Sequence, residues 1–212
     1  MILWAFNPMK AYFDCETSAL PLEILQKSMP IFEANKTLKD PEKIAADIEK
    51  KRQAYIADAA LDPLTGKVLA IGIYDELGFS CISGDEKTML ETFWKLADET
   101  LSTSNQLVGF NVNDFDLPFL FKRSWHHGIQ PPKILRDGRY WNRDIIDLRE
   151  VWQLGDRQAV GGLDAVSRFF GLEGKSGSGK DFAATWESDR AAALKYLETD
   201  LLLTKKLAEV ML

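Results

Sequence analysis

The chain has 212 residues, enough for one large domain, and an ordinary globular composition of 46% hydrophobic and 27% charged residues. No stretch approaches the roughly 18 apolar residues of a membrane span, and the opening MILWAFNP lacks a signal peptide's basic leader, so we expect a cytoplasmic protein. The net charge of −6 argues against a nonspecific DNA-coating protein, but not against a nuclease with an acidic site.

Strand-like apolar runs in the first half of the chain are expected at residues 10–16, 67–74 and 79–83, with a DELG hairpin turn between the last two. Between the first two strands lies an insertion, residues 18–66. Its segment 40–58 is typical of a charged amphipathic helix, which we interpret as a solvated lid or buttress.

The pattern SGDE, from Ser83 to Glu86, has the form of a capping box and predicts the start of a helix. The apolar stripe of that helix repeats at three- and four-residue intervals: Leu90, Phe93, Ala97 and Leu101.

The second half of the chain alternates short strands with helices. The expected elements are a strand at 106–110, a helix at about 116–127, a strand at 143–148, a helix at about 162–170, a glycine-rich loop, and a long helix at about 188–211. The order β-β-β-α-β-α-β-α-α predicts a mixed α/β fold. We interpret residues 1–212 as a single domain carrying the insertion.

The metal-binding chemistry open to the chain is limited by its few cysteines and histidines. Cys15 and Cys81 lie in apolar strand-like runs and are expected to be small buried residues. The only histidines, His126 and His127, are adjacent and build no zinc cluster. A bound metal would have oxygen ligands, which favours Mg²⁺ or Mn²⁺.

The stretch YFDCET places two carboxylates inside an apparent strand. Because side chains alternate along a strand, Asp14 and Glu16 share one face, while Phe13 and Cys15 share the other. Two bare charges two residues apart on one face of a strand repel by about 2–3 kcal/mol at an effective dielectric near 20. Either a cation offsets this repulsion, or one carboxyl keeps its proton.

Two further acidic positions follow downstream. In VGFNVNDFDLPFL, Asp116 lies where a turn leads into a helix, and a helix N-cap is its simplest alternative role. In YLETD, Tyr196 and Asp200 lie one turn apart on one face of the last helix, where an Asp among apolar residues has no propensity rationale.

Each short pattern has a false match in the same chain. Asp47 and Glu49 also read D-x-E, but in the charged helix, where the two side chains do not share a face. Tyr140 and Asp144 also read Y-x-x-x-D, but across the start of a strand. Only the ordered set, in its structural context, indicates a site.

That ordered set resembles the DEDD superfamily of 3′–5′ exonucleases, in the subclass with a tyrosine in its third motif (DEDDy). It is most similar to the exonuclease domains of B-family DNA polymerases and their stand-alone relatives. The matching segments are FDCET, GFNVNDFDLPFL and YLETD, with further likeness in DIIDL and GGLDAVSRFFGLEGKSG. The resemblance covers about residues 10–207 outside the insertion, and it implies a ribonuclease H-like fold, a five-stranded mixed sheet with helices on both sides.

The resemblance also implies a role for each motif residue in hydrolysis with two divalent metals about 4 Å apart. The residue matching Asp14 bridges the metals, those matching Glu16 and Asp200 hold the nucleophile-side metal, and that matching Asp116 supports the second. The residue matching Tyr196 orients the attacking water. Three positions are expected by analogy near the terminal nucleotide: Asn111, Phe115 and Leu117.

The glycine-rich segment GKSGSGKD has P-loop spacing, but Asp181 replaces the required Ser or Thr, and the segment follows a helix end rather than a strand. We interpret it instead as a loop whose Lys175 and Lys180 contact substrate phosphates.

Two other functions also use clustered carboxylates or this kind of fold. A glycosidase needs two carboxyls across a sugar rather than four with a tyrosine. A nucleic-acid-binding module on a degenerate nuclease fold is a stronger alternative than a glycosidase. Such a module should lack at least one metal ligand, whereas all five motif residues are present in this sequence. The sequence therefore predicts a Mg²⁺- or Mn²⁺-dependent 3′–5′ exonuclease that releases nucleoside monophosphates. We expect single-stranded DNA as substrate, with RNA left open, and a polymerase or another replication or repair protein as a partner in trans.

Overall fold

The computed structural model describes residues 9–132, 144–156, 158–175, 177 and 179–212. They fold into two compact units: one contains the residues up to Glu16 and from Leu69 onward, and the other contains Thr17–Val68.

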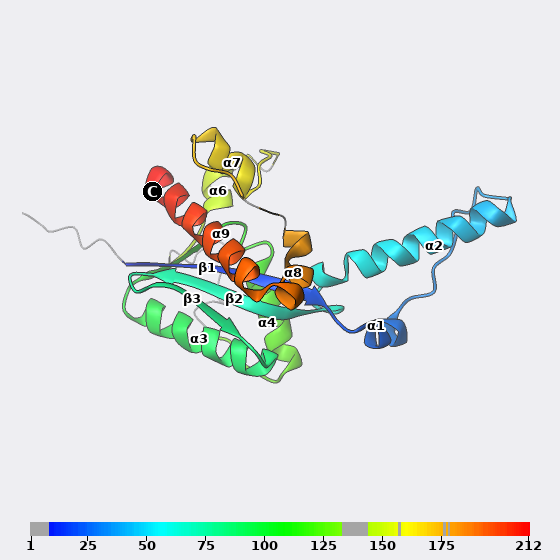
Figure 1. Cartoon of the computed structure of the whole chain (residues 1–212), viewed down its shortest axis with the longest axis horizontal. Coiled ribbons are helices and arrows are strands. Elements are labelled where there is room, and N and C mark those ends of the chain that lie inside the picture. Colours follow the sequence, from blue (N-terminus) through cyan, green and yellow to red (C-terminus); the bar gives the residue numbers. More distant parts are fainter. Residues whose placement is uncertain (1–8, 133–143, 157, 176, 178) are drawn as a thin grey trace, which may run out of the picture. The chain divides into compact units, whose positions relative to one another are not determined.

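The sheet has five strands in the order β3-β2-β1-β4-β5 and is mixed, as expected (Figure 1). The bounds are β1 Lys10–Ala19, β2 Gly66–Asp75, β3 Gly78–Ser83, β4 Gln106–Gly109 and β5 Ile145–Asp147. β2 and β3 form the expected antiparallel hairpin, whereas β1, β4 and β5 run parallel, with Tyr12, Val108 and Ile146 in register across the three. The carboxyl ends of β1, β4 and β5 therefore meet at one edge of the sheet.

Helices cover both faces of the sheet. They are α3 Glu86–Ser102, α4 Asp116–His126, α6 Leu148–Gln153, α7 Leu163–Phe169, α8 Phe182–Ser188 and α9 Arg190–Met211, with a 3₁₀ turn, η2, at Gly179–Asp181. Figure 1 shows α3 and α9 on opposite sides of the strands. α9 packs against α6, α7 and α8, while α3 packs against α4.

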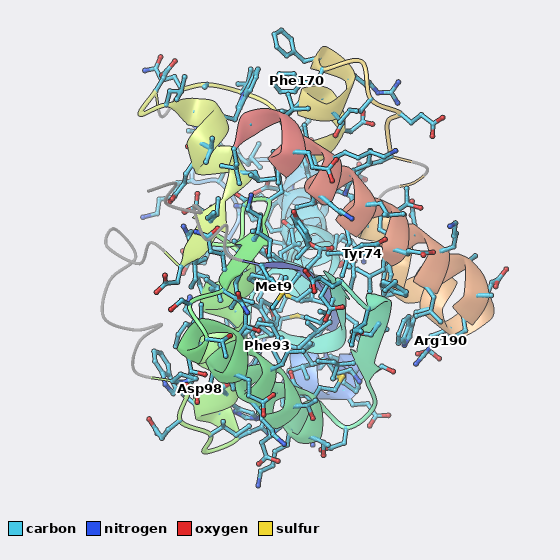
Figure 2. All side chains as sticks on the ribbon, turned by 90° about the vertical axis from the view of Figure 1, so that its left-hand side faces the viewer. Met9, Tyr74, Phe93, Asp98, Phe170 and Arg190 are labelled. Carbon is cyan, nitrogen blue, oxygen red and sulfur yellow. The ribbon has the colours of Figure 1, made fainter. Side chains whose placement is uncertain are left out.

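The core follows the predicted patterns. Phe93 on α3 is fully buried against Phe13 of β1, with ring centroids 5.4 Å apart. In Figure 2, Phe93 lies toward the sheet and Asp98 on the outer side of the same helix. On the opposite face, Gly72 of β2 lets α9 approach so closely that an added Cβ would lie 2.7 Å from Leu197 Cγ and 2.8 Å from Leu201 Cδ1.

Several elements differ from the sequence-based expectation. The α3 helix is capped by Asp85, whose carboxylate accepts from Thr88 N, so the predicted capping box at Ser83 is wrong. The short helices α6 and α8 were not expected. The strand predicted at 143–148 spans only β5, and Arg143 lies outside the described residues.

The second unit contains α1 Leu22–Ser28, α2 Pro41–Ala57 and the 3₁₀ turn η1 Ala59–Leu61. Asp40 caps α2 by accepting from Glu42 N, and Pro41 occupies the first helical position, which explains where the helix begins. The helix expected at 40–58 is therefore present. No residue of α2 is buried, so it shows no buried apolar face.

Both cysteines are free. Cys15 is buried as expected, whereas Cys81 is only half-buried. Among the described helices, none combines the length and the apolar character that crossing a membrane requires.

Candidate active site

Three carboxylates from two elements converge at the sheet edge. Asp14 and Glu16 on β1 and Asp200 on α9 each offer an oxygen atom, and these oxygens all lie within 4.8 Å of one another. Strand alternation places Phe13 and Cys15 on the opposite face, where they are 1% and 4% exposed. Because Asp14 and Glu16 lie on the same face of β1, both carboxylates belong to the same cluster.

The α9 helix presents two adjacent faces to its surroundings. Leu197 and Leu201, four residues apart, pack on Gly72. Tyr196 and Asp200, each one residue earlier, form a second stripe along the same helix. Asp200 is only 2% exposed, and it lies in an apolar helix because its carboxylate belongs to the acidic cluster.

Asp116 lies outside the three-carboxylate cluster but is joined to it through β1. It is the first residue of α4, and Phe115 holds the cap position without a side-chain cap bond, so Asp116 is not an N-cap. Its Oδ1 instead accepts a 2.8 Å hydrogen bond from the backbone N–H of Cys15, between the two β1 carboxylates. This bond fixes the start of α4 beside the cluster.

Burial and mutual repulsion favour the protonated forms of these acids. Burial, with the charge of Asp200 adding to it, raises the pKa of Asp14 to about 6. Burial and the Asp14 charge hold the pKa values of Glu16 and Asp116 well above the usual range. Burial also raises the pKa of Asp200, although Lys175 opposes it. The crowding is unfavourable unless a cation shares the site.

Lys175, from the glycine-rich loop, brings a positive charge into the cluster. Its Nζ lies 2.5 Å from Asp200 Oδ2 and donates to the Tyr196 hydroxyl at 3.2 Å. Burial alone would lower the pKa of Lys175, but Asp200, Tyr196 and Asp14 outweigh it and raise the pKa. Burial and Asp200 raise the pKa of Tyr196, so its phenol keeps its proton.

The loop that carries Lys175 is anchored on α7. Lys175 N donates to Asp164 Oδ1 at 2.7 Å, and Arg168 Nε pairs with Asp164 Oδ2 at 2.9 Å. Gly174 lies directly against this pair, where a Cβ would collide with both side chains. The segment joins α7 to η2 rather than a strand to a helix, which agrees with the rejection of a P-loop. Lys180 lies in η2 and is exposed.

Tyr196 also borders open space. A cavity of about 270 Å³ lies between the segment from η2 to α8 and the start of α9, and it is lined by Gly177, Asp181, Phe182, Thr185, Ala192, Ala193 and Tyr196. Tyr196 thus connects the carboxylates with a space that water can enter.

The donor set fits a hard divalent cation. Asp200 Oδ1 is buried without a hydrogen-bond partner, which is costly for a carboxylate unless something else binds it. Together with Asp14 and Glu16 it supplies only oxygen donors, the ligands that Mg²⁺ and Mn²⁺ prefer.

The positions expected near a substrate lie in the β4–α4 segment. Asn111 is half-buried and has a left-handed backbone, with φ 68°. Phe115 is half-buried and packs on Phe119, and Leu117 is only 6% exposed. The contacts of these three residues with substrate stay predictions.

The false D-x-E match belongs to the helix α2 rather than to a strand. Asp47, on α2, pairs with Lys51 at 2.9 Å and accepts from Asn35 N, while Glu49 is on the same helix. Tyr140 lies outside the described residues. Sequence reasoning missed Asp164 and the β5-end residue Asp147. Asp147 could have been found from the sequence, because it is a polar residue at the end of an apolar strand that is parallel to β1.

A parallel-strand edge bearing clustered acids, on a five-stranded mixed sheet flanked by helices, defines an α/β protein with a ribonuclease H-like fold. Of 142 matching chains of solved structures, one is the family B DNA polymerase from the hyperthermophilic archaeon Pyrobaculum calidifontis. It matches with a TM-score of 0.62 and 18% identity over 96% of this chain, which spans about a quarter (24%) of the polymerase. That likeness shows the fold.

Residues 68–207 match the family described as predicted 3′–5′ exonucleases related to the exonuclease domain of PolB, and the chain belongs to this family. A search among curated proteins finds no match. The matched span contains Asp116, Tyr196 and Asp200 but begins after the β1 carboxylates. The geometry of β1, rather than the family match, is what adds Asp14 and Glu16 to the cluster.

Proposed function

We propose that this protein is a divalent-metal-dependent 3′–5′ exonuclease of the DEDDy type, which removes nucleoside monophosphates from the 3′ end of single-stranded DNA. The observation that carries the proposal is the convergence of Asp14, Glu16 and Asp200 within 4.8 Å, beside Tyr196. Membership in a family of predicted exonucleases supports the reaction class.

In this proposal, Asp14, Glu16 and Asp200 bind Mg²⁺ or Mn²⁺, and Asp116 supports a second ion. The bound metals would supply activation of water and neutralisation of charge on the phosphate and the leaving oxygen. The orphaned Oδ1 of Asp200 supports a ligand role for this residue. Asp116 keeps the second motif in place through its bond to Cys15 N.

Tyr196 and Lys175 act on the water and the phosphate. Because its pKa is raised, the Tyr196 hydroxyl carries a proton at neutral pH and orients a water molecule through hydrogen bonds rather than removing its proton. The Lys175 ammonium, which reaches Asp200 and Tyr196, offers a positive charge to a scissile phosphate at the same place.

The wider assignment follows from the same site. Removing a terminal nucleotide requires an unpaired end, which favours a single-stranded substrate. We further propose that residues 1–212 are one exonuclease domain in which 18–66 is an insertion. A cytoplasmic location, and a polymerase or a repair protein as a partner in trans, complete the proposal.

The deciding experiment is digestion of 5′-labelled single-stranded DNA and RNA with Mg²⁺, Mn²⁺ or EDTA, alongside Asp14→Ala. We expect a ladder of 3′-shortened products with either metal, and none with EDTA or with the variant. Failure to cleave with any divalent metal would favour the binding-only alternative.

The two loop lysines provide a matched pair for testing phosphate contact. We expect Lys175→Ala to weaken DNA binding and to lower kcat, because this side chain reaches the cluster. Lys180→Ala, on the exposed η2 turn, should have the smaller effect. Fluorescence anisotropy with a labelled oligonucleotide measures the DNA binding of both variants, and initial cleavage rates measure kcat. Unchanged binding in the double variant would contradict any substrate role for this loop.

A further inference from the structure

A second polar network lies at the same sheet edge, where β4 and β5 end. Gly109 of β4 is in register with Asp147 of β5, so the residues just beyond these strands are neighbours. The network contains Asp147, Asn111, Asn113 and Arg149, none of which belongs to the acidic cluster.

Asp147 fastens the segment between β4 and α4. Its carboxylate accepts from Asn111 N at 2.7 Å, from Asn113 N at 2.9 Å and from Arg149 N at 2.9 Å. The residue is only 4% exposed, so these backbone donors satisfy the oxygens of a buried carboxyl group. A left-handed backbone at Asn111 is unfavourable for most residues, and here the bond from its own N–H to Asp147 holds it.

Arg149 determines which way the Asn111 amide faces. Its Nη1 lies 2.8 Å from the Asn111 side chain. A guanidinium has only donors, so the amide atom that it contacts must be the oxygen. The Asn111 oxygen is thereby occupied, and its Nδ2 group donates to no other residue within the described ranges.

We propose that Asp147 and Arg149 are positioning residues that hold Asn111 as a dedicated hydrogen-bond donor for the terminal nucleotide. Asp147 sets the backbone of Asn111, and Arg149 occupies the amide oxygen so that only the NH₂ group faces the substrate. The group it recognises is an acceptor oxygen or ring nitrogen of the nucleotide. This inference rests on the proposed function and adds the polarity of one substrate contact.

The first test is a double-mutant cycle with the full chain and a 5′-labelled single-stranded DNA. Asn111→Ala removes the amide and should raise KM about tenfold while kcat at saturation changes little. Arg149→Met only frees the amide to rotate, so it should raise KM by a smaller factor, about twofold or more. The double variant should be no worse than Asn111→Ala, because both changes act through one contact. Arg149→Lys keeps a donor next to the oxygen and should restore most of the binding.

The second test separates donor polarity from folding. Asn111→Asp retains a contact with Arg149, and strengthens it, but it has no donor. We expect an unchanged or higher melting temperature together with a raised KM. Wild-type KM in Asn111→Asp or Arg149→Met, or multiplicative effects in the double variant, would overturn the inference.

These outcomes are distinct from failure of the proposed function, which Asp14→Ala reports. If the wild type binds DNA without cleaving it, the same variants should weaken binding measured by anisotropy in EDTA, and the inference survives the loss of the enzyme assignment. If the wild type neither cleaves nor binds, both are overturned.

Discussion

Tyr196 keeps its proton because burial and the neighbouring Asp200 carboxylate both raise the pKa of its phenol. Its position one turn before Asp200 follows directly from helix geometry, and YLETD was sufficient to predict it. For Lys175, the sequence predicted a contact with substrate phosphate but not the ion pair with Asp200. A loop rich in glycine has no periodicity, so only the folded structure shows its ammonium 2.5 Å from Asp200.

Replacing Tyr196 with Phe removes the hydroxyl and leaves the ring. We expect kcat to fall about 10²-fold or more, with little change in DNA binding, because the hydroxyl acts on water rather than on the nucleotide. Initial rates and anisotropy measure the two quantities. Tyr74→Phe is the matched control, since the Tyr74 ring lies under the Lys205 ammonium, and its rate should match the wild type. Equal loss in both variants would argue against a specific role for Tyr196.

The raised carboxyl pKa values give a pH dependence with a definite sign. Asp14 titrates at about 6 in the folded protein and near 3.8 when unperturbed, so the metal-free folded state binds more protons than the unfolded state between these values. Its stabilising contribution is present below the lower value and is lost as the pH rises through about 6. In EDTA, the melting temperature should therefore fall as the pH is raised from about 4.5 to about 6.5, a range that lies around the folded pKa of Asp14.

The matched variant is Asp14→Asn, which cannot titrate and should show a shallower fall. Divalent metal competes with protons for the same oxygens, so the stabilisation by Mn²⁺ should grow over the same pH range. A melting temperature in EDTA that rises with pH, equally in both proteins, would contradict this account of the cluster.

At the scale of elements, the strands and longer helices follow from apolar periodicity, which is why β1, β2, α3 and α9 lie close to their expected bounds. The shorter elements do not. β5 has three residues and α6 has six, too few to show a repeating pattern. The start of α3 shows a second limit: SGDE offers both Ser83 and Asp85 as caps, and the choice depends on how the chain leaves β3.

Asp147 provides a test at this scale. Asp147→Ala leaves the backbone donors of Asn111, Asn113 and Arg149 without their buried acceptor. We expect unfolding to become easier by about 3 kcal/mol or more, which chemical denaturation measures. Asp156→Ala is a suitable control, because Asp156 accepts from Gln158 N in an exposed turn, and it should cost far less. Similar losses in both variants would show that the buried network contributes no more than a surface turn.

Gly72 provides a second test. Gly72→Ala places a methyl group against Leu197 and Leu201, so we expect a loss of about 1–3 kcal/mol from overpacking. Gly162 has open space around its Cβ position and an extended backbone, so Gly162→Ala causes no overpacking, and the loss of a glycine N-cap on α7 should cost about 1 kcal/mol at most. Thermal melts of the two variants make the comparison. Equal stability would mean that the core absorbs the methyl group without moving α9.

For the whole molecule, the five-stranded mixed sheet could be predicted because the order of the motifs along the chain matched a known fold. The second unit, Thr17–Val68, could not be interpreted beyond its charged helix, because none of its patterns resembles a motif with known chemistry. The acidic cluster lies between these cases: its residue types were legible in the sequence, while the place of Asp116 outside the three-carboxylate group required the structure.

Metal binding should be visible in global stability. A ligand that binds only the folded state at about 100 times its Kd adds about 2.7 kcal/mol to the free energy of unfolding. We expect Mg²⁺ or Mn²⁺ to raise the melting temperature of the wild type but not of Asp200→Asn. Ca²⁺ also prefers oxygen ligands, so measuring both the melting temperature and the cleavage rate with Ca²⁺ separates metal binding from turnover. Indifference of the wild type to every divalent ion would count against the cluster as a metal site.

The close approach of α9 to Gly72 also sets a distance for the chemistry. Leu197 and Leu201 rest on this glycine, and Tyr196 and Asp200 are their immediate neighbours on the same rigid helix. The absence of a side chain at Gly72 thereby sets the distance from the Asp200 carboxylate to the carboxylates of Asp14 and Glu16. A bulkier residue at position 72 would push α9 away and lengthen this distance, so an apolar contact in the core determines the spacing of the metal ligands.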